Sequence, residues 1–324
     1  MKPSYIELYK NSKLDKLIDQ TYEMLSSCAI CPRQCKVNRL KDARGFCNTG
    51  FKPKFYSALA HHGEEPPISG TYGSGTIFFS NCNMRCVYCQ NYEFSQCESG
   101  KEIEVEKLAE LMLKLQEKKC HNINLVTPTH VMPQILAALK LAAAGGLNIP
   151  IVYNTSGYEL PEIIKLLEKI VDIYLVDMRY ADLQMSKKYS HAPDYPEYNQ
   201  KSVKEMHRQV GVAKINNEGI IEKGLIIRHL VMPDNISGTE KIMQFIAHQI
   251  SKESYISLMS QYYPFYKASE FPRLNRRITK EEYDAAISCM QEQGLHNGWI
   301  QESGGLDRFA GINIKPGIKI AKID

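Results

Sequence analysis

Apolar runs of strand length alternate with longer segments of helical period from about residue 104 onward. This alternation predicts βαβ units, and therefore a parallel sheet covered by helices. The first strand is expected at residues 76–80, and the others at 123–126, 149–153, 173–176, 225–230 and 255–259. Helices are expected at 104–118, after Pro133, around 163–167, and at 203–210, 241–250 and 280–293, the last ended by Gly294.

These six strand and helix pairs predict an α/β fold whose sheet curls into a partial (β/α)6 barrel. Ligands of such a sheet bind at the carboxyl ends of the strands, where the βα loops meet. Residues 1–75 lack the alternation and are rich in Cys, Gly and Pro, so we expect an N-terminal extension there. Residues 76–324 are expected to form the barrel and a C-terminal tail. Segment 189–198, with two prolines and three tyrosines, is interpreted as a long loop after the fourth strand.

Composition places the chain among ordinary globular proteins, with 44% hydrophobic and 23% charged residues. The net charge of +4 is small and evenly spread, so nucleic acid is not an expected partner. No run approaches the ~20 apolar residues of a membrane-spanning helix. The first residues lack the apolar region of a signal peptide, and we therefore expect a cytoplasmic location without membrane association.

Ten cysteines are the first chemically informative count. In a reducing compartment, clustered cysteines bind metal more often than they form disulfides. One group has the spacing C-x2-C-x3-C-x11-C and consists of Cys28, Cys31, Cys35 and Cys47. A second group has the spacing C-x3-C-x2-C and consists of Cys82, Cys86 and Cys89. Cys97, Cys120 and Cys289 stand apart, and we assign them no catalytic role.

The triplet Cys82, Cys86 and Cys89 falls in the first expected βα loop, with Tyr88 just before the last cysteine. Three thiolates suit a soft metal or an iron–sulfur cluster, and they leave one metal position without a protein ligand. A structural zinc site would need a fourth ligand from elsewhere in the chain. The spacing therefore indicates a reactive cluster.

At this triplet the chain resembles the radical S-adenosylmethionine (SAM) superfamily, and within it the pyruvate formate-lyase activating enzyme-like subfamily. The resemblance is carried by residues 64–70, 73–79, 81–92, 124–130, 153–157, 177–180, 228–233 and 261–264. It implies the partial barrel of the radical SAM type and a [4Fe-4S] cluster on the three cysteines, with SAM on the fourth iron. It also implies reductive cleavage of SAM to methionine and a 5′-deoxyadenosyl radical, which abstracts hydrogen from a substrate.

The resemblance further implies two kinds of partner. One is a reductant such as flavodoxin or ferredoxin, and the other is a protein or peptide substrate, for example a glycyl-radical enzyme. The alternative from a different functional class is an iron–sulfur electron-transfer or metal-binding protein that does not cleave SAM. The aromatic residues of the tail, Tyr262, Tyr263, Phe265, Tyr266 and Trp299, would serve either substrate contact or packing.

Candidate SAM contacts lie after the expected second strand. In the wider superfamily a Gly-Gly-Glu motif binds the SAM amino group there, whereas this chain has Thr127-Pro128-Thr129-His130. The oxygen atoms of Thr127 and Thr129 are expected to accept from the amine instead. The alternative is that both residues only turn the chain into the following helix.

The next two strands end in segments similar to those of glycyl-radical activating enzymes. Asn154 and Ser156 lie where these relatives have Asp-Thr-Asn-Gly, and Asp177 and Arg179 lie where they have Asp-x-Lys. The two aspartates of the relatives help to form a monovalent-cation site, which Asn154 weakens here. Arg179 has a planar fork suited to the SAM carboxylate, and Ser156 is a candidate for a ribose or carboxylate hydrogen bond. Alternatively, Asp177 is only a salt-bridge partner of Arg179.

Arg228 and His229 end the expected fifth strand. Because neighbouring side chains of a strand point to opposite faces, only one of them should face the barrel interior. We expect Arg228 to face inward and contact SAM, as in the activating enzymes, and His229 to be packed. The upstream pairs His61-His62 and Glu64-Glu65 are interpreted as solvated loop residues, the alternative being that they face the substrate side of the cluster.

The N-terminal group Cys28, Cys31, Cys35 and Cys47 supplies four thiolates from one short segment. Four soft ligands suffice for a structural zinc ion, and an auxiliary iron–sulfur cluster would use the same number. A redox switch without metal is a third possibility. The sequence predicts a second metal site and leaves its metal open.

Overall fold

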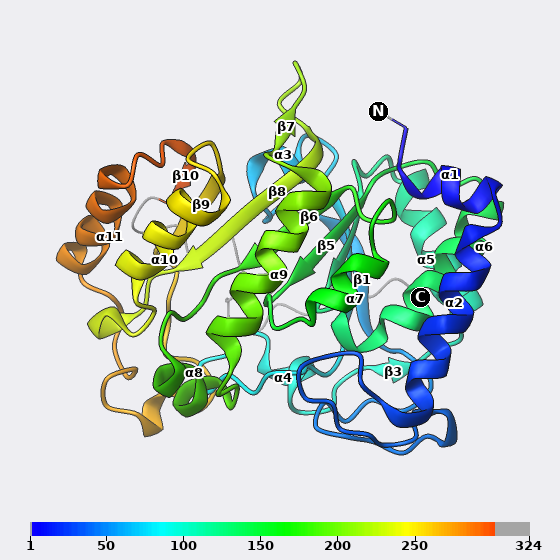
Figure 1. Cartoon of the computed structure of the whole chain (residues 1–324), viewed down its shortest axis with the longest axis horizontal. Coiled ribbons are helices and arrows are strands. Elements are labelled where there is room, and N and C mark those ends of the chain that lie inside the picture. Colours follow the sequence, from blue (N-terminus) through cyan, green and yellow to red (C-terminus); the bar gives the residue numbers. More distant parts are fainter. Residues whose placement is uncertain (1, 302–324) are drawn as a thin grey trace.

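One sheet with the strand order β10-β9-β8-β6-β5-β4-β2-β1-β3 runs through the computed structural model (Figure 1). The structure describes residues 2–301, so the expected tail beyond residue 301 lies outside the described residues. The strands are β1 (Lys54–His61), β2 (Ser74–Phe79), β3 (Lys101–Glu102), β4 (Ile123–Val126), β5 (Ile151–Thr155), β6 (Ile173–Asp177), β8 (Ile221–Leu230), β9 (Tyr255–Met259) and β10 (Asn297–Ile300). From β2 to β10 along this path all neighbours are parallel, while β7 (Lys214–Ile215) pairs antiparallel with β8.

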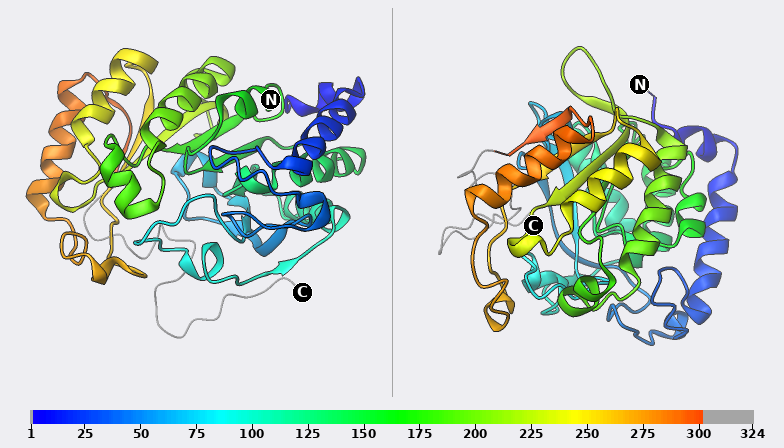
Figure 2. Two further views of the ribbon diagram at one scale, coloured as in Figure 1. Left: turned by 60° about the horizontal axis from the view of Figure 1, so that its bottom comes forward. Right: turned by 60° about the vertical axis from the view of Figure 1, so that its left-hand side comes forward.

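Helices follow most of the parallel strands and cover the outer face of the sheet (Figures 1 and 2). They are α5 (Val105–Glu117), α6 (Met132–Ala144), α7 (Pro161–Leu166), α8 (Leu183–Ser190), α9 (Tyr195–Val210), α10 (Thr239–Phe245) and α11 (Lys280–Glu292). Two short helices, α3 (Pro66–Ser69) and α4 (Tyr92–Ser95), flank β2 and the cysteine triplet. The α/β fold with a largely parallel sheet is confirmed, and each of the six predicted strands overlaps an observed one.

The prediction of a long loop at 189–198 is wrong. Helix α8 extends to Ser190 and α9 begins at Tyr195, so only residues 191–194 connect them. Asp182 caps α8 by accepting from the backbone N–H groups of residues 184 and 185. Pro196 lies in the first turn of α9, where a missing N–H costs no helical hydrogen bond, so the proline favours a helix start rather than a loop.

The N-terminal 75 residues contribute strand β1 to the sheet. Strand β1 pairs antiparallel with β2, in a register that joins Phe55 to Phe79 and His61 to Ser74. Helix α2 (Lys13–Glu23), together with the short α1 (Tyr5–Lys10), packs against α6. Because β2 begins at Ser74, the strand crosses the boundary expected at residue 75. Among the described residues no helix is long and apolar enough to cross a membrane.

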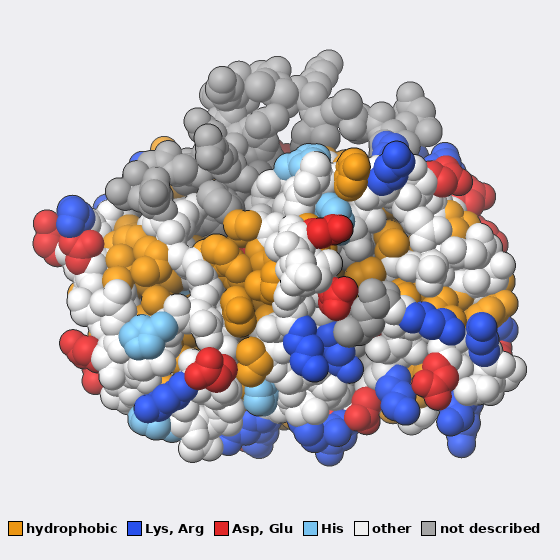
Figure 3. Space-filling model, turned by 90° about the horizontal axis from the view of Figure 1, so that it is seen from above, with side chains coloured by type: hydrophobic (Ala, Val, Ile, Leu, Met, Phe, Trp, Pro, Cys, Tyr) orange, Lys and Arg blue, Asp and Glu red, His pale blue; other side chains and the backbone are white. Residues whose placement is uncertain are grey.

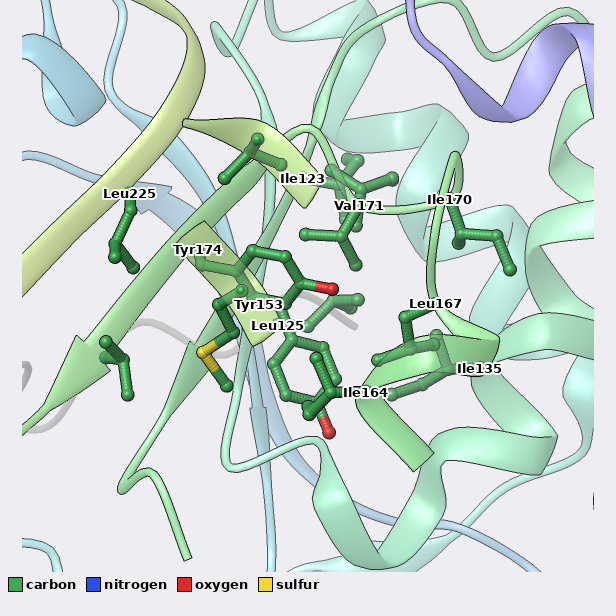
Figure 4. Close-up of a cluster of buried hydrophobic side chains, with 14 of the residues drawn as sticks. Ile123, Leu125, Ile135, Tyr153, Ile164, Leu167, Ile170, Val171, Tyr174 and Leu225 are labelled. Carbon is green, nitrogen blue, oxygen red and sulfur yellow. The ribbon is translucent and has the colours of Figure 1, made fainter. Parts of the chain in front are cut away.

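The main core lies between the sheet and its helices (Figure 4). Ile123 and Leu125 of β4 and Tyr153 of β5 face Ile135 of α6 and Ile164 of α7 there. All five side chains are at most 4% exposed, and burial of this apolar surface holds the strands and thereby their carboxyl ends in place. The opposite ends of the strands lie near the face in Figure 3, where basic and acidic side chains are interspersed.

Gly157 allows a close approach at the carboxyl end of β5. Its φ is +75°, and a Cβ atom there would lie 2.1 Å from Asn199 Nδ2 and 2.7 Å from the Asp177 carbonyl oxygen. We expect Gly157→Ala to lower the free energy of unfolding by about 3 kcal/mol or more, because backbone strain and crowding add up. Gly146→Ala is the matched control, since Gly146 has φ +95° and open space around it, and should cost only about 1–2 kcal/mol. Equal losses in urea unfolding would refute the crowding argument.

Candidate functional site

The cysteine triplet lies in the loop between β2 and α4, at the carboxyl end of the parallel sheet. Hydrogen-bond donors point at its sulfur atoms. The backbone N–H of Met84 lies 3.3 Å from Cys82 Sγ, and Cys86 Sγ accepts from Ser190 Oγ at 3.0 Å and from Arg179 Nη1 at 3.2 Å. Such donors stabilise thiolates, so the loop is suited to hold a thiolate-ligated metal group.

The three thiols also lie within electrostatic range of one another. Burial, together with the nearby Cys86 and Cys89, raises the pKa of Cys82 to about 12. Within residues 2–301 no three His, Cys, Asp or Glu side chains are arranged to hold a single metal ion. A [4Fe-4S] cluster binds each thiolate to a different iron atom, so its ligands lie further apart than those of one ion. The donor set fits such a cluster.

A cavity opens beside the triplet, in the concave interior of the sheet. Tyr88 and Cys89 form one part of its wall. Asn154, Asp177 and Arg228, from the ends of β5, β6 and β8, form another. The cavity therefore lies at the carboxyl ends of the strands, where the fold predicts a ligand site.

Asp177 forms ion pairs with both arginine side chains that line this cavity. Its Oδ2 accepts from Arg179 Nε at 3.0 Å, and its Oδ1 accepts from Arg228 Nε at 2.7 Å. Burial opposes ionisation of Asp177, but Arg228 and Arg179 outweigh burial and hold the pKa of its carboxyl below the ordinary value. Arg228 also donates to Asn154 Oδ1 at 2.7 Å and lies 3.5 Å from Glu64 Oε2. The carboxylate is thus ionised and orients two guanidinium groups.

Four of the predicted SAM contacts, Asn154, Asp177, Arg179 and Arg228, line this cavity. The other three do not. The Thr129 hydroxyl donates to Glu159 Oε1 at 2.5 Å, and the backbone N–H of Thr127 donates to the Asn154 carbonyl at 2.9 Å. The Ser156 carbonyl accepts from the Tyr195 hydroxyl at 2.8 Å. The loop after β4 thus turns towards the protein interior rather than the cavity.

The interpretation of Glu64 and Glu65 as solvated loop residues is wrong. Both side chains are buried, and Glu64 lines the cavity. Its Oε1 accepts from Asn124 Nδ2 at 3.0 Å and from Asn154 Nδ2 at 3.3 Å. Burial raises the pKa of Glu64, and Arg228 opposes this shift. Asn124, a polar residue in an apolar strand, was the one feature of the sequence that indicated a buried polar partner such as Glu64, because a buried amide needs a polar partner.

The predicted alternation at the end of β8 is confirmed. Arg228 faces the cavity, while His229 is fully buried on the other side of the strand. The His229 ring bonds the Met178 carbonyl at 2.8 Å through Nδ1 and Thr239 Oγ1 at 2.9 Å through Nε2. Burial lowers the pKa of His229 to about 4, so the ring is neutral and structural.

Glu159 is a buried carboxyl, and its ionisation is expected to make the free energy of unfolding depend on pH. Burial raises its pKa from 4.5 to about 7, although bonds from Thr129, Thr155 and Tyr153 act the other way. Between these two pH values the folded state binds more protons than the unfolded state, so stability falls as pH rises. Relative to Glu159→Gln, the wild type should lose about 3 kcal/mol of unfolding free energy from pH 4.5 to 7.

Urea unfolding of both proteins across this pH range measures the difference. Glu162→Gln, on the exposed side of α7, serves as the control and should follow the wild type. Parallel curves for the wild type and Glu159→Gln would contradict the proton uptake by Glu159.

The N-terminal cysteines gather at a second cavity. All four of Cys28, Cys31, Cys35 and Cys47 line it. Its remaining walls include Arg39 and His130. In Figure 1 the blue loop that carries these cysteines lies near the cyan segment around α4 and β3, at the same end of the sheet as the triplet.

Residues 76–246 match the family described as the Radical SAM superfamily. An uncharacterized protein of Methanocaldococcus jannaschii is 32% identical over 301 residues, which cover 90% of this chain and 82% of the relative. The pyruvate formate-lyase-activating enzyme of Clostridium pasteurianum is 29% identical over 111 residues, which cover 33% of this chain and 45% of that enzyme.

Proposed function

Because the chain belongs to the radical SAM superfamily, whose members are SAM-cleaving enzymes with a [4Fe-4S] cluster, we propose that Cys82, Cys86 and Cys89 hold that cluster and that SAM binds in the adjoining cavity. The observation that carries this proposal is the position of Arg179, which donates both to Cys86 Sγ and to Asp177. One side chain thereby connects the cluster loop to the charged wall of the cavity.

The cluster, once bound and reduced, supplies the electron that splits SAM into methionine and a 5′-deoxyadenosyl radical. The residues of this chain bind and orient the cofactor. Arg179 and Arg228, held in place by Asp177, present guanidinium groups to the SAM carboxylate. Glu64 and the Asn154 amide offer oxygen atoms to the SAM amine and ribose hydroxyls. Glu64 thus replaces Thr127 and Thr129 as the proposed acceptor for the SAM amine.

Hydrogen abstraction from a protein or peptide is the proposed reaction, with a glycyl-radical enzyme among the candidate substrates. Tyr263 supports a large substrate, because it lines the cavity and is 41% exposed. The partial similarity to a pyruvate formate-lyase-activating enzyme supports it as well. We further propose a low-potential donor such as flavodoxin or ferredoxin as the source of the electron, and a second metal centre at the N-terminal cysteines.

Hydrogen transfer from a labelled substrate tests the proposed function. The chain is reconstituted anaerobically with iron and sulfide, reduced with dithionite and incubated with SAM. Extract from cells grown on a deuterated medium is added after ultrafiltration into macromolecular and small-molecule fractions. We expect deuterium in the 5′-deoxyadenosine when the macromolecular fraction is present. Label only from small molecules would contradict a protein substrate, and no 5′-deoxyadenosine under any reductant would favour an electron-transfer protein without SAM cleavage.

A further inference from the structure

The hydroxyl of Ser190, the last residue of α8, lies against the cysteine triplet. It donates to Cys86 Sγ at 3.0 Å, although the two residues are 104 positions apart in sequence. Two backbone hydrogen bonds hold this helix end on the loop that carries the triplet. The N–H of Arg85 donates to the Ser190 carbonyl at 3.2 Å. The N–H of Val87 donates to the Tyr189 carbonyl at 2.9 Å, so the backbone fixes the Ser190 hydroxyl beside the sulfur atom.

A second hydroxyl, from Tyr180, extends this contact towards the cavity. Its oxygen lies 2.7 Å from Ser190 Oγ and 2.7 Å from the hydroxyl oxygen of Tyr88. Tyr88 is one of the residues that line the cavity beside the triplet. Three hydroxyl groups therefore form a continuous chain from a residue of the cavity wall to the Cys86 sulfur atom.

This hydroxyl chain is shielded from water. Ser190 and Tyr180 are at most 1% exposed, and Tyr88 and Cys86 are each 4% exposed. Hydrogen bonds to a charged acceptor are stronger in such a low-dielectric environment, and bonds in series polarise one another. A reduced cluster carries one more negative charge than an oxidised one, so a donor to its thiolate stabilises the reduced form more. The position of the Ser190 hydroxyl thus favours the uptake of an electron.

We propose that Ser190 and Tyr180 are positioning residues that raise the reduction potential of the cluster on the triplet. Ser190 acts on the Cys86 sulfur directly, and Tyr180 acts through Ser190 by orienting and polarising its hydroxyl. In the step that they favour, the electron donor loses one electron and the cluster gains it, while no bond breaks and no proton moves along the hydroxyls. The inference rests on the proposed function and extends it to two residues, neither of which lines the cavity proposed for SAM.

Redox titration of the anaerobically reconstituted full chain tests this proposal. The reduced cluster is followed by its electron paramagnetic resonance signal without SAM, and the signal that changes on addition of SAM is assigned to the triplet. In Ser190→Ala the equilibrium constant for reduction should fall about tenfold, or about 59 mV for one electron, because a hydrogen bond to a charged group is lost. Tyr180→Phe should lower the potential by less, because the bond from Ser190 to Cys86 remains.

Ser186→Ala is the matched control for these two variants. Ser186 is also fully buried on α8, but its hydroxyl donates to the Leu183 carbonyl at 3.1 Å rather than to a sulfur atom. Its potential should therefore equal that of the wild type. Iron and sulfide contents of the same samples show that chains with equal cluster content are compared. An unchanged or higher potential in Ser190→Ala or in Tyr180→Phe would overturn the proposal.

Tyr180→Phe keeps the test decisive if Ser190→Ala fails to take up the cluster. This variant removes one buried oxygen atom and leaves the aromatic ring in place, so the packing around the triplet is retained. The potential and the iron content require no SAM cleavage, and their failure is therefore distinct from failure of the proposed function.

Discussion

Replacing Cys86 with alanine is expected to reduce 5′-deoxyadenosine formation by more than about a hundredfold, beyond the loss caused by removing an outer contact of a metal ligand. Cys86 is buried, and its sulfur atom accepts from Ser190 and Arg179. The variant removes a proposed cluster ligand and leaves the Arg179 Nη1 donor without its sulfur acceptor. Product formation from SAM under dithionite, followed by chromatography, measures the effect.

Cys97→Ala provides the matched control for this experiment. Cys97 lies eight residues after Cys89 and is exposed, so its loss should leave product formation unchanged. Iron content measured on the same samples separates loss of the cluster from loss of SAM binding. Product formation at the wild-type rate in Cys86→Ala would contradict the role assigned to the triplet.

Asp177→Asn is expected to produce the second large effect, on both stability and SAM affinity. The Asp177 side chain is 7% exposed and neutralises Arg179 and Arg228, whose side chains are 26% and 17% exposed. Removing the charge leaves two largely buried guanidinium groups without their shared carboxylate. We expect a loss of about 3 kcal/mol in the free energy of unfolding, the low end for breaking a buried ion pair. The affinity for SAM should fall at least about tenfold, because both guanidinium groups lose their orientation.

Anaerobic urea unfolding and calorimetric titration with SAM measure these two quantities. Glu197→Gln is the control, since it removes a carboxylate from an exposed i, i+4 pair with Lys201 on α9 and should leave both unchanged. A variant Asp177→Asn that unfolds like the wild type and binds SAM equally well would mean that Asp177 neither holds the arginines nor shapes the cavity.

Local sequence patterns were enough to predict the main strands and the loop that holds the cysteine triplet. Strand β4 at Ile123–Val126 and strand β9 at Tyr255–Met259 lie at their predicted residues, because each is a short apolar run bounded by polar or turn residues. The inward position of Arg228 and the buried position of His229 follow from the alternation of side chains along a strand. The triplet was recognisable because its three cysteines lie within one loop.

Glu64 shows where this kind of prediction fails. It lies in a polar stretch of the sequence, yet it is buried against Asn124 and Asn154, which are 60 and 90 residues away in sequence. The helix start at Tyr195 was missed for a different reason, because proline was interpreted as a loop signal although it also favours the first turn of a helix.

The order of apolar and polar residues in this chain was sufficient to specify an α/β sheet, its six main strands and a thiolate triplet after the first of them, because these features depend on neighbours close in sequence. The assembly of Glu64, Asn154, Asp177 and Arg228 around one cavity depended on the curvature of the sheet. The contacts that bring Arg33 to Asn83 and Phe46 to Arg85 depended on the packing of one loop against another. Side chains distant in sequence meet only when the strands are packed, and it is this packing that removes them from water and sets their charges.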